Sequence, residues 1–531
     1  MVDSANPDTR SKPGPIRILF KNSAPAPVVY AALGAAASFY GYPLIISVTN
    51  WGNLLLVFVC LVIAAASFLR VLANSSFLFL PEKDKNEIPA IIPKINLVLL
   101  ACVTGICLGL SARAGIAAVN IPLPLSGVNT LTGILQDDPR AFNDGRGMGS
   151  LQLSRASNID GVQASAKGNV TVFFPVPAIP RLKEFGRGSE IHVEGNLIFT
   201  DRGYLFRASQ VHILKPAPVP EQFRTGFRTM VMEKFGILQD DETIPPVWAG
   251  LASAMLLGIR DDLDTGLTSS FNSAGCSHVL SLSGMHLAVL SGIIVLVLRL
   301  FLGVRPASAI GAIFIVIYIF LAGSQPSLVR SGIIYLLGTI SLWGYLKKNP
   351  LSLLAMAFLV QLVFQSESGL TVSFLLSYLA MAGILVSGQS FYEMLRGRIP
   401  DIILAGLSAS IGAFIATAGI TAFYFGELHP VGILAGLFIM PLASLFMVLA
   451  FGSLILICII PVLFGPINFI LTTVYRLLEF LVTLAGKTPG IKTPSFMPVL
   501  IISVFIIALL EFLKYRDSNY RRSIASFDTG L

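Results

Sequence analysis

The chain contains a series of apolar stretches, each long enough to cross a lipid bilayer as a helix. A helix needs about 20 mainly apolar residues to span roughly 30 Å of hydrocarbon. Charged residues make up only 12% of the 531 residues and the mean hydropathy is +0.77, a composition foreign to soluble domains of this length. The sequence therefore predicts a polytopic α-helical membrane protein with about ten to twelve spans. The long candidates are 28–48, 54–73, 97–117, 279–303, 307–323, 328–346, 402–424, 441–464 and 497–514, and shorter, partly re-entrant ones are 351–365, 372–388 and 466–486.

Lysine and arginine residues are distributed among the loops in a way that predicts orientation. Short loops rich in these residues stay in the cytoplasm, and four loops hold neither residue: 49–53, 323–325, 365–369 and 426–430. We therefore expect a multi-pass protein of the cytoplasmic (inner) membrane, with both termini in the cytoplasm and the segment after the third span outside it. The corresponding segments are a tail at 1–22, three transmembrane helices within 23–119, and a basic tail at 515–531.

Residues 120–216 differ from the rest of the chain, because hydrophobicity falls and apolar residues alternate with polar ones. Turn residues recur every 8–12 positions or so, as in all-β domains. Five or six short strands in about 95 residues favour a small closed barrel of the oligonucleotide/oligosaccharide-binding (OB) type, here placed outside the cytoplasm. The strands are expected at 128–135, 147–154, 169–174, 189–199 and 204–213, with a bend at Gly195.

Basic residues of this barrel are interleaved with aromatic ones. Proteins that bind single-stranded nucleic acid use cations along the backbone and aromatic rings against the bases. Acidic residues nearly balance the charge, however, and many aromatic side chains are needed to fill the barrel, so a purely structural role is the alternative. The candidate DNA-binding residues are Arg140, Arg146, Lys167, Arg187, Arg202, Arg207, Phe174 and Tyr204.

Segment 217–277 has the composition of neither a soluble domain nor a transmembrane span. Phe223, Phe227, Met230, Val231 and Phe235 share one helical face, with arginines elsewhere, so we expect a helix lying in the membrane interface. The apolar run at 250–258 is too short to cross and is expected to be buried or re-entrant.

A Ser-x-Ser-Gly-x-His cluster at 281–286 stands at the start of an apolar run that continues to Leu302. Polar and ionisable side chains are costly in a bilayer and need partners. Ser283 and His286 lie three apart on one helical face, whereas Ser281 and Gly284 belong to a stripe of small residues on another. One face is therefore expected to pack against a helix and the other to line a cavity. The alternative is a histidine held between helices without further role.

Arg330 lies about one turn inside the next helix that starts at the outer surface, after Pro326 in its first turn. Arg330 and His286 both belong to the external half of the membrane, where positive charge would attract an extended anion. The structural alternative pairs Arg330 with Glu367 or Glu427. The five cysteines and five histidines show no metal-site spacing, so no metal, cofactor or catalytic residue is predicted.

Several of these motifs resemble those of the ComEC competence family. Residues 275–286 are similar to the signature G-x-x-H-x-x-x-x-S-G-x-H, and 323–331 to G-x-x-P-S-x-x-R-A. Ser373–Ala380 resembles G-F-Q-L-S-F-x-A, and His429–Gly436 the element P-x-G-x-x-x-N. The resemblance covers most of the chain. It implies a competence channel domain at 278–514, with a candidate substrate path at Ser281, Ser283, Gly284, His286, Gln325, Ser327, Arg330 and Ser377.

The family resemblance implies transport of single-stranded DNA across the membrane during natural transformation, without enzymatic chemistry. It also implies a separate nuclease, an external DNA receptor and a cytoplasmic ATP-driven helicase-like motor as partners, with dimerisation left open. The metallo-β-lactamase-like domain found C-terminally in many relatives is not expected here, because no His-x-His-x-Asp-His motif occurs. Leu375 and Gly436 depart from the family's glutamine and asparagine. They support the alternative of a membrane-embedded enzyme or an exporter of a small anionic substrate.

Overall fold

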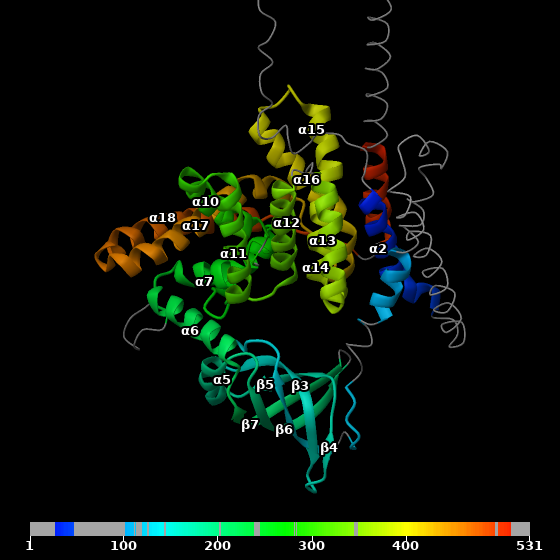
Figure 1. Ribbon diagram of the computed structural model, residues 1–531, viewed down its shortest axis with the longest axis vertical. Coiled ribbons are helices and arrows are strands. Elements are labelled where there is room, and N and C mark those ends of the chain that lie inside the picture. Colours follow the sequence, from blue (N-terminus) through cyan, green and yellow to red (C-terminus); the bar gives the residue numbers. More distant parts are fainter. Residues whose placement is uncertain are drawn as a thin grey trace, which may run out of the picture. The chain divides into compact units, whose positions relative to one another are not determined.

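The computed structural model describes most of the chain as two units, each presented here by itself (Figure 1). Unit 1 comprises 1–109, 333–437 and 489–531, and unit 2 comprises 110–332 and 438–488. The predicted span at 54–73, both tails, Ser281, Ser283 and Arg202 lie outside the described residues. The described residues are 27–46, 101–110, 112, 119–124, 127–142, 145–200, 203–237, 245–280, 282, 284–344, 349–493 and 497–510.

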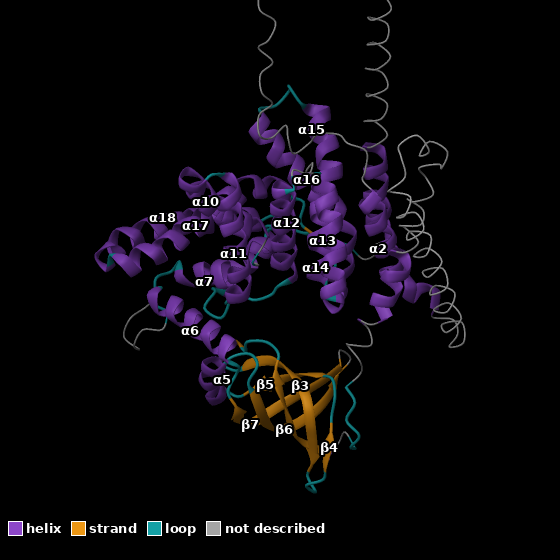
Figure 2. Cartoon of the chain, in the orientation of Figure 1, coloured by secondary structure: helices purple, strands orange, loops and turns teal. Residues whose placement is uncertain are grey.

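Unit 2 contains a closed β-barrel, drawn in orange in Figure 2. Its strands pair in the cyclic order β1–β6–β7–β5–β3 and back to β1, and β5 pairs with β7 in parallel while the other pairs are antiparallel. This is the order of an OB barrel, so the predicted barrel is confirmed, with two short strands and a helix that were not predicted. The elements are β1 (Val128–Leu135), β2 (Arg140–Ala141), β3 (Gly147–Asn158), β4 (Gln163–Ser165), β5 (Asn169–Phe174), α5 (Ile179–Phe185), β6 (Glu190–Thr200) and β7 (Gly203–Lys215).

Alternation along the strands builds the barrel core. Leu131, Val172 and Phe206 are 0% exposed and point inward, while their neighbours along each strand face out. The predicted bend at Gly195 is confirmed as a register shift between β6 and β7. A Cβ atom at Gly195 would collide with the Arg207 carbonyl oxygen, so only glycine allows the two strands to approach this closely.

The helices of unit 2 follow the barrel in sequence. The amphipathic segment forms α6, but its expected single apolar face is divided: Val231 and Phe235 are buried, whereas Phe223 is 66% exposed. The short apolar run forms α7, whose residues are nearly all buried, as expected. The helices are α6 (Val219–Lys234), α7 (Ala249–Leu257), α8 (Thr265–Ser273), α9 (Ser277–Leu280), α10 (Gly284–Leu302), α11 (Val304–Ala322), α12 (Pro326–Trp343), α17 (Val431–Ile459) and α18 (Phe464–Gly486). Of these, α12 ends in unit 1 and α17 begins there.

Unit 1 is a helical unit in which small residues allow close packing. Gly383 and Gly412 bring the backbones of α14 and α16 so close that a Cβ on either would collide with the other's carbonyl oxygen. A π-helical turn at Ile384–Gly388 joins α14 to α15. The elements are α2 (Pro27–Ile46), α13 (Pro350–Phe364), α14 (Val372–Gly383), α15 (Gln389–Leu395), α16 (Asp401–Phe425), β8 (Glu427–Leu428), β9 (Ile491–Lys492) and the apolar helices Ala101–Leu110 and Met497–Leu510.

The described part of the chain holds six helices that are long and apolar enough to cross a membrane. Together with the barrel, they confirm the predicted class of a polytopic helical membrane protein with an inserted β-domain. The six are Gly284–Leu302, Val304–Ala322, Val372–Leu395, Asp401–Phe425, Val431–Ile457 and Phe464–Gly486.

Candidate nucleic-acid interface

One row of side chains crosses the outer surface of the barrel over four strands. Arg140 pairs with Met148, Met148 with Phe173, and Phe173 with Arg207. Residues directly opposite one another on paired strands point to the same side of a sheet. Arg140 and Arg207 are exposed, and Met148 and Phe173 are half-buried. Two arginines thus flank an aromatic ring on one face of β2, β3, β5 and β7.

A second aromatic ring extends this row. Phe142 follows β2 and stacks on Phe173, with ring centroids 6.1 Å apart and planes 14° from parallel. The Phe142 side chain is 42% exposed, so much of it faces solvent. Arg146 is also exposed. It lies beside Phe142, because its carbonyl oxygen accepts a 2.7 Å hydrogen bond from the Phe142 amide. Stacked rings beside cations are the arrangement that single-strand-binding barrels use.

The prediction of Phe174 as a DNA-contacting residue is wrong. Phe174 is 1% exposed and packs in the barrel core, because it continues the inward positions of Val170 and Val172. Its neighbour Phe173 takes the outward position. The alternation of Asn169–Phe174 carried this signal, since residues two apart on a strand share a face. Tyr204 is partly buried and packs against the same core.

Arg187 and Lys167 are not brought into this row. The Arg187 guanidinium lies 2.6 Å from the Glu221 carboxylate of α6, so it serves contacts between barrel and helix. Lys167 is exposed but precedes β5 by two residues, at the end of that strand opposite to Phe173. Of the predicted cations within the described residues, Arg140, Arg146 and Arg207 therefore gather at one place.

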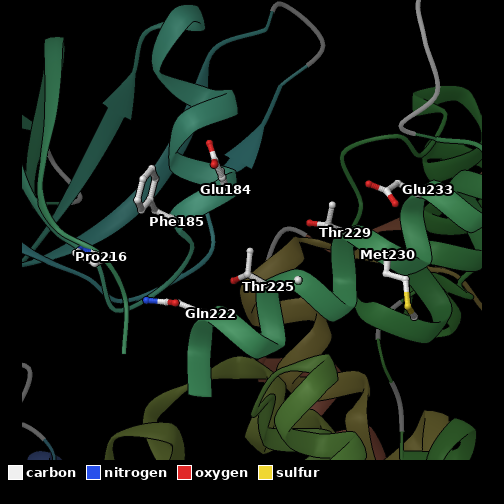
Figure 3. Close-up of a pocket in the computed structure, with 9 residues that line it drawn as sticks. Glu184, Phe185, Pro216, Gln222, Thr225, Thr229, Met230 and Glu233 are labelled. Atoms are coloured by element: carbon white, nitrogen blue, oxygen red, sulfur yellow. The ribbon is translucent and has the colours of Figure 1, made fainter. Parts of the chain in front are cut away.

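A cleft between α5 and α6 lies elsewhere in unit 2, with a volume of about 610 Å³ (Figure 3). Apolar and hydroxyl side chains line it, and its charged lining residues, Glu184 and Glu233, are both acidic. Carboxylates repel phosphate groups, so the surface of this cleft is less favourable for nucleic acid than the row of arginines and phenylalanines.

The predicted membrane cluster is partly assembled around the first turns of α10 and α12. The Ser327 hydroxyl donates a 2.7 Å hydrogen bond to the Leu282 carbonyl oxygen. Gly284 opens α10 with α12 directly against it: a Cβ there would collide with the Ser331 hydroxyl and come within 3.0 Å of an Arg330 guanidinium nitrogen. The structure therefore brings Gly284, Ser327 and Arg330 together.

The other predicted path residues have different surroundings. His286 is 0% exposed and Arg330 is 5% exposed, so both are enclosed by protein. The Gln325 amide nitrogen lies 3.2 Å from the position of a Cβ on Gly258, which ends α7 with a left-handed backbone (φ 72°). No periodic pattern in the chain predicts that α7 lies beside this cluster. Ser377 lies on α14 of unit 1. Among the described residues, no group of three metal-ligating side chains is arranged to hold a metal ion.

One family model and two known proteins resemble parts of the chain. Residues 255–516 match the family model described as "Competence protein". Over 311 residues the chain is 21% identical to ComE operon protein 3 of Bacillus subtilis (strain 168), covering 56% of this chain but only 38% of that protein. It is also 24% identical over 326 residues to an uncharacterized protein of Aquifex aeolicus (strain VF5), covering 61% of this chain and 74% of that protein. Through residues 255–516, the chain belongs to the competence protein family.

Proposed function

We propose that this protein transports single-stranded DNA across the cytoplasmic membrane during natural transformation, with the barrel receiving the strand on the outer side. The observation that carries the proposal is the row of Arg140, Phe173 and Arg207 with Phe142 stacked upon it. Guanidinium groups beside exposed rings suit a strand with free bases, because cations contact the phosphates while the rings stack on the bases. Membership of the competence family supports the same substrate.

The membrane path is proposed to run past Gly284, Ser327 and Arg330, with Ser281, Ser283, His286, Gln325 and Ser377 as further members. An arginine inside a membrane domain is costly unless it has a polar task. A guanidinium offers a phosphate several hydrogen-bond donors together with charge. The outer location of the barrel and the cytoplasmic termini are proposed from the distribution of lysine and arginine among the loops.

Transport of a long polymer needs partners, and we include three in the proposal. A nuclease supplies the single strand, an external receptor delivers duplex DNA, and a cytoplasmic ATP-driven motor pulls the strand inward. In this scheme the chain acts as a channel rather than as an enzyme.

The direct test is a transformation assay in a strain that lacks this protein. The strain should take up no labelled DNA, and the wild-type gene should restore uptake. A variant with alanine at Phe142 and Phe173 should reach normal membrane levels but take up less DNA. Purified full-length protein should bind labelled oligothymidylate. This double variant should bind it roughly 5- to 150-fold more weakly, which corresponds to the loss of about 1–3 kcal/mol for one base stacked on the pair of rings.

A small anionic substrate is the second candidate, and one observation favours it. His286 and Arg330 are enclosed almost completely by protein, which suits a small anion better than a polymer. Normal transformation by the deletion strain, together with loss of export of an anionic metabolite, would favour this alternative.

A further inference from the structure

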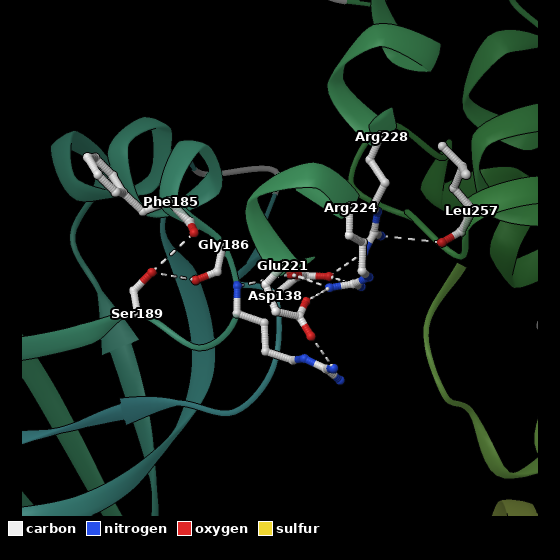
Figure 4. A network of polar contacts seen from close by, with 9 residues as sticks. Asp138, Phe185, Gly186, Ser189, Glu221, Arg224, Arg228 and Leu257 are labelled. Carbon is white, nitrogen blue, oxygen red and sulfur yellow. Dashed lines mark hydrogen bonds and ion pairs between the residues drawn. The ribbon is translucent and has the colours of Figure 1, made fainter. Parts of the chain in front are cut away.

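One carboxylate of the barrel, that of Asp138, binds two arginines of α6 (Figure 4). Asp138 lies in the loop between β1 and β2, and its carboxylate accepts hydrogen bonds from Arg224 at 2.5 Å and from Arg228. The Arg187 amide also donates to this carboxylate, at 3.3 Å. Glu221 holds Arg224 from the other side at 3.1 Å. The barrel loop is thus fixed to α6 by ion pairs from several directions.

Little of either arginine side chain reaches solvent, so both depend on nearby carboxylates for charge compensation. The Arg224 and Arg228 side chains are only 4% and 13% exposed. Burial alone would raise the pKa of the Asp138 carboxyl, but the guanidinium groups of Arg228 and Arg224 hold that pKa below its ordinary value. Removing one partner of a buried ion pair leaves the other charge without compensation.

The same two arginines also reach the end of α7 and the turn before α12. Arg228 donates a 3.3 Å hydrogen bond to the carbonyl oxygen of Leu257, the last residue of α7. An Arg224 guanidinium nitrogen lies 3.7 Å from the Cβ position of Gly323, in the turn between α11 and α12. The next residue after Leu257 is Gly258, whose Cβ position lies 2.7 Å from a Leu282 methyl group and close to Gln325. α6 therefore connects the barrel loop to the residues that begin α12.

A second contact holds the other end of the same loop. Asp261, in the segment after α7, lies 2.7 Å from the Lys183 ammonium group of α5. The Asp261 carboxylate also accepts a 3.2 Å hydrogen bond from the Ala141 amide of β2. Loop 136–142, which carries both Arg140 and Phe142, is thus held at two points, through Asp138 and through Ala141.

We infer that Asp138 is a positioning residue, which holds loop 136–142 in a fixed place relative to α6, α7 and the start of α12. A strand bound on the barrel is thereby delivered to the path at Gly284 and Arg330. This inference rests on the proposed function. It assigns Arg224 and Arg228 to the junction between barrel and membrane helices rather than to DNA contacts. Without Asp138, the barrel still binds DNA, but the bound strand is no longer presented to the helices at a fixed point.

The test compares two aspartates that are adjacent in the same loop. Asp138→Asn keeps the shape of the side chain but removes the charge, and Asp137→Asn does the same at an exposed position. Full-length Asp138→Asn should bind oligothymidylate within twofold of wild type, yet its DNA uptake per molecule in the membrane should fall at least tenfold. Asp137→Asn should match wild type in both measurements. Asp138→Glu, which retains the charge, should recover a substantial part of uptake.

Two results would overturn the inference. The first is normal uptake by Asp138→Asn, and the second is an equal loss of DNA binding and uptake, because Asp138 would then belong to the DNA-binding face itself.

If Asp138→Asn is depleted from the membrane, a second variant tests the inference, with cysteines at 138 and 228 in a background without the five native cysteines. Joining them with a short bismaleimide should restore uptake, and restored abundance without uptake would contradict the inference. The proposed function fails separately, if alanine at Phe142 and Phe173 leaves DNA binding unchanged.

Discussion

Phe142 and Phe173 stack on the outside of the barrel, with their ring centroids 6.1 Å apart, while Phe174 beside them lies in the core. Three phenylalanines within one small region therefore have two different environments. The exposed pair offers a flat surface to a base. The buried ring contributes to the stability of the domain that presents this surface.

We predict that the two kinds of phenylalanine respond differently to truncation. Phe173→Ala should weaken binding of oligothymidylate and leave thermal unfolding of the barrel nearly unchanged, because its ring is partly solvated. Phe174→Ala should destabilise the barrel by about 3–5 kcal/mol, since it leaves a cavity in the core. Fluorescence anisotropy and thermal melting of the full-length protein measure the two effects. Equal losses of affinity at matched fractions of folded protein would contradict the assignment.

The salt dependence of DNA binding should identify the cations that contact phosphates. Arg207→Gln should lower the slope of log K against log salt by about 0.7, because one phosphate contact on a single strand is lost. Lys167→Gln is the matched control, since this exposed cation lies two residues before β5, away from the end that carries Phe173. Titrations at several salt concentrations give both slopes. A larger change for Lys167→Gln would move the interface to that end of the barrel.

The barrel could be predicted closely because its strands alternate and are separated by turns. The expected strands at 128–135 and 169–174 coincide with β1 and β5. Composition alone does not distinguish Phe174 from Phe173, whereas the alternation along β5 does, because it turns Phe174 into the core. The ion pair of Arg187 could not be predicted, because its partner, Glu221, is 34 residues away and the approach of Glu221 depends on how α6 packs. Local patterns therefore give strands, whereas ion pairs across the fold do not follow from them.

The membrane region could be predicted as spans but not as a site. Apolar length alone indicates the helices, and α16 and α18 lie where spans were expected. The approach of Gln325 to Gly258 depends on where the short helix α7 packs, which is beside α9 and α11. Such tertiary placement leaves no periodic signal in the sequence.

The junction between barrel and α6 should be insensitive to pH over the physiological range. The pKa of Asp138 is lowered in the folded protein, so its stabilising contribution is present above the unfolded pKa of about 3.9 and is lost only as pH falls through the lower folded value. The difference in melting temperature between wild type and Asp138→Asn should therefore stay constant from about pH 5 to pH 8 and shrink below about pH 4. A difference that changes between pH 6 and pH 7 would point to another titrating group.

Two glycines of α10 provide a matched pair for helix packing. Gly284→Ala places a methyl group against the Ser331 hydroxyl and near Arg330, whereas a Cβ at Gly292 meets no atom within 4 Å. Gly284→Ala should cost about 1–3 kcal/mol through overpacking and lower uptake, and Gly292→Ala should have little effect. Adding Ser331→Gly to Gly284→Ala should recover uptake, because it removes the colliding atoms. Membrane abundance and DNA uptake are measured together, and equal effects of the two glycine variants would contradict this account.

The last prediction concerns Arg330, which is 5% exposed at the start of α12. If its guanidinium contacts the phosphates of the passing strand, Arg330→Ala should abolish uptake while the protein remains at normal levels in the membrane. Arg330→Gln should do nearly the same, because a neutral donor holds a phosphate less well than a charged one. Arg299→Gln, on an exposed position near the end of α10, is the control and should transport normally. If Arg330→Ala instead depletes the protein and Arg330→Gln restores both abundance and uptake, the residue has a structural role, because hydrogen bonding without charge is then sufficient.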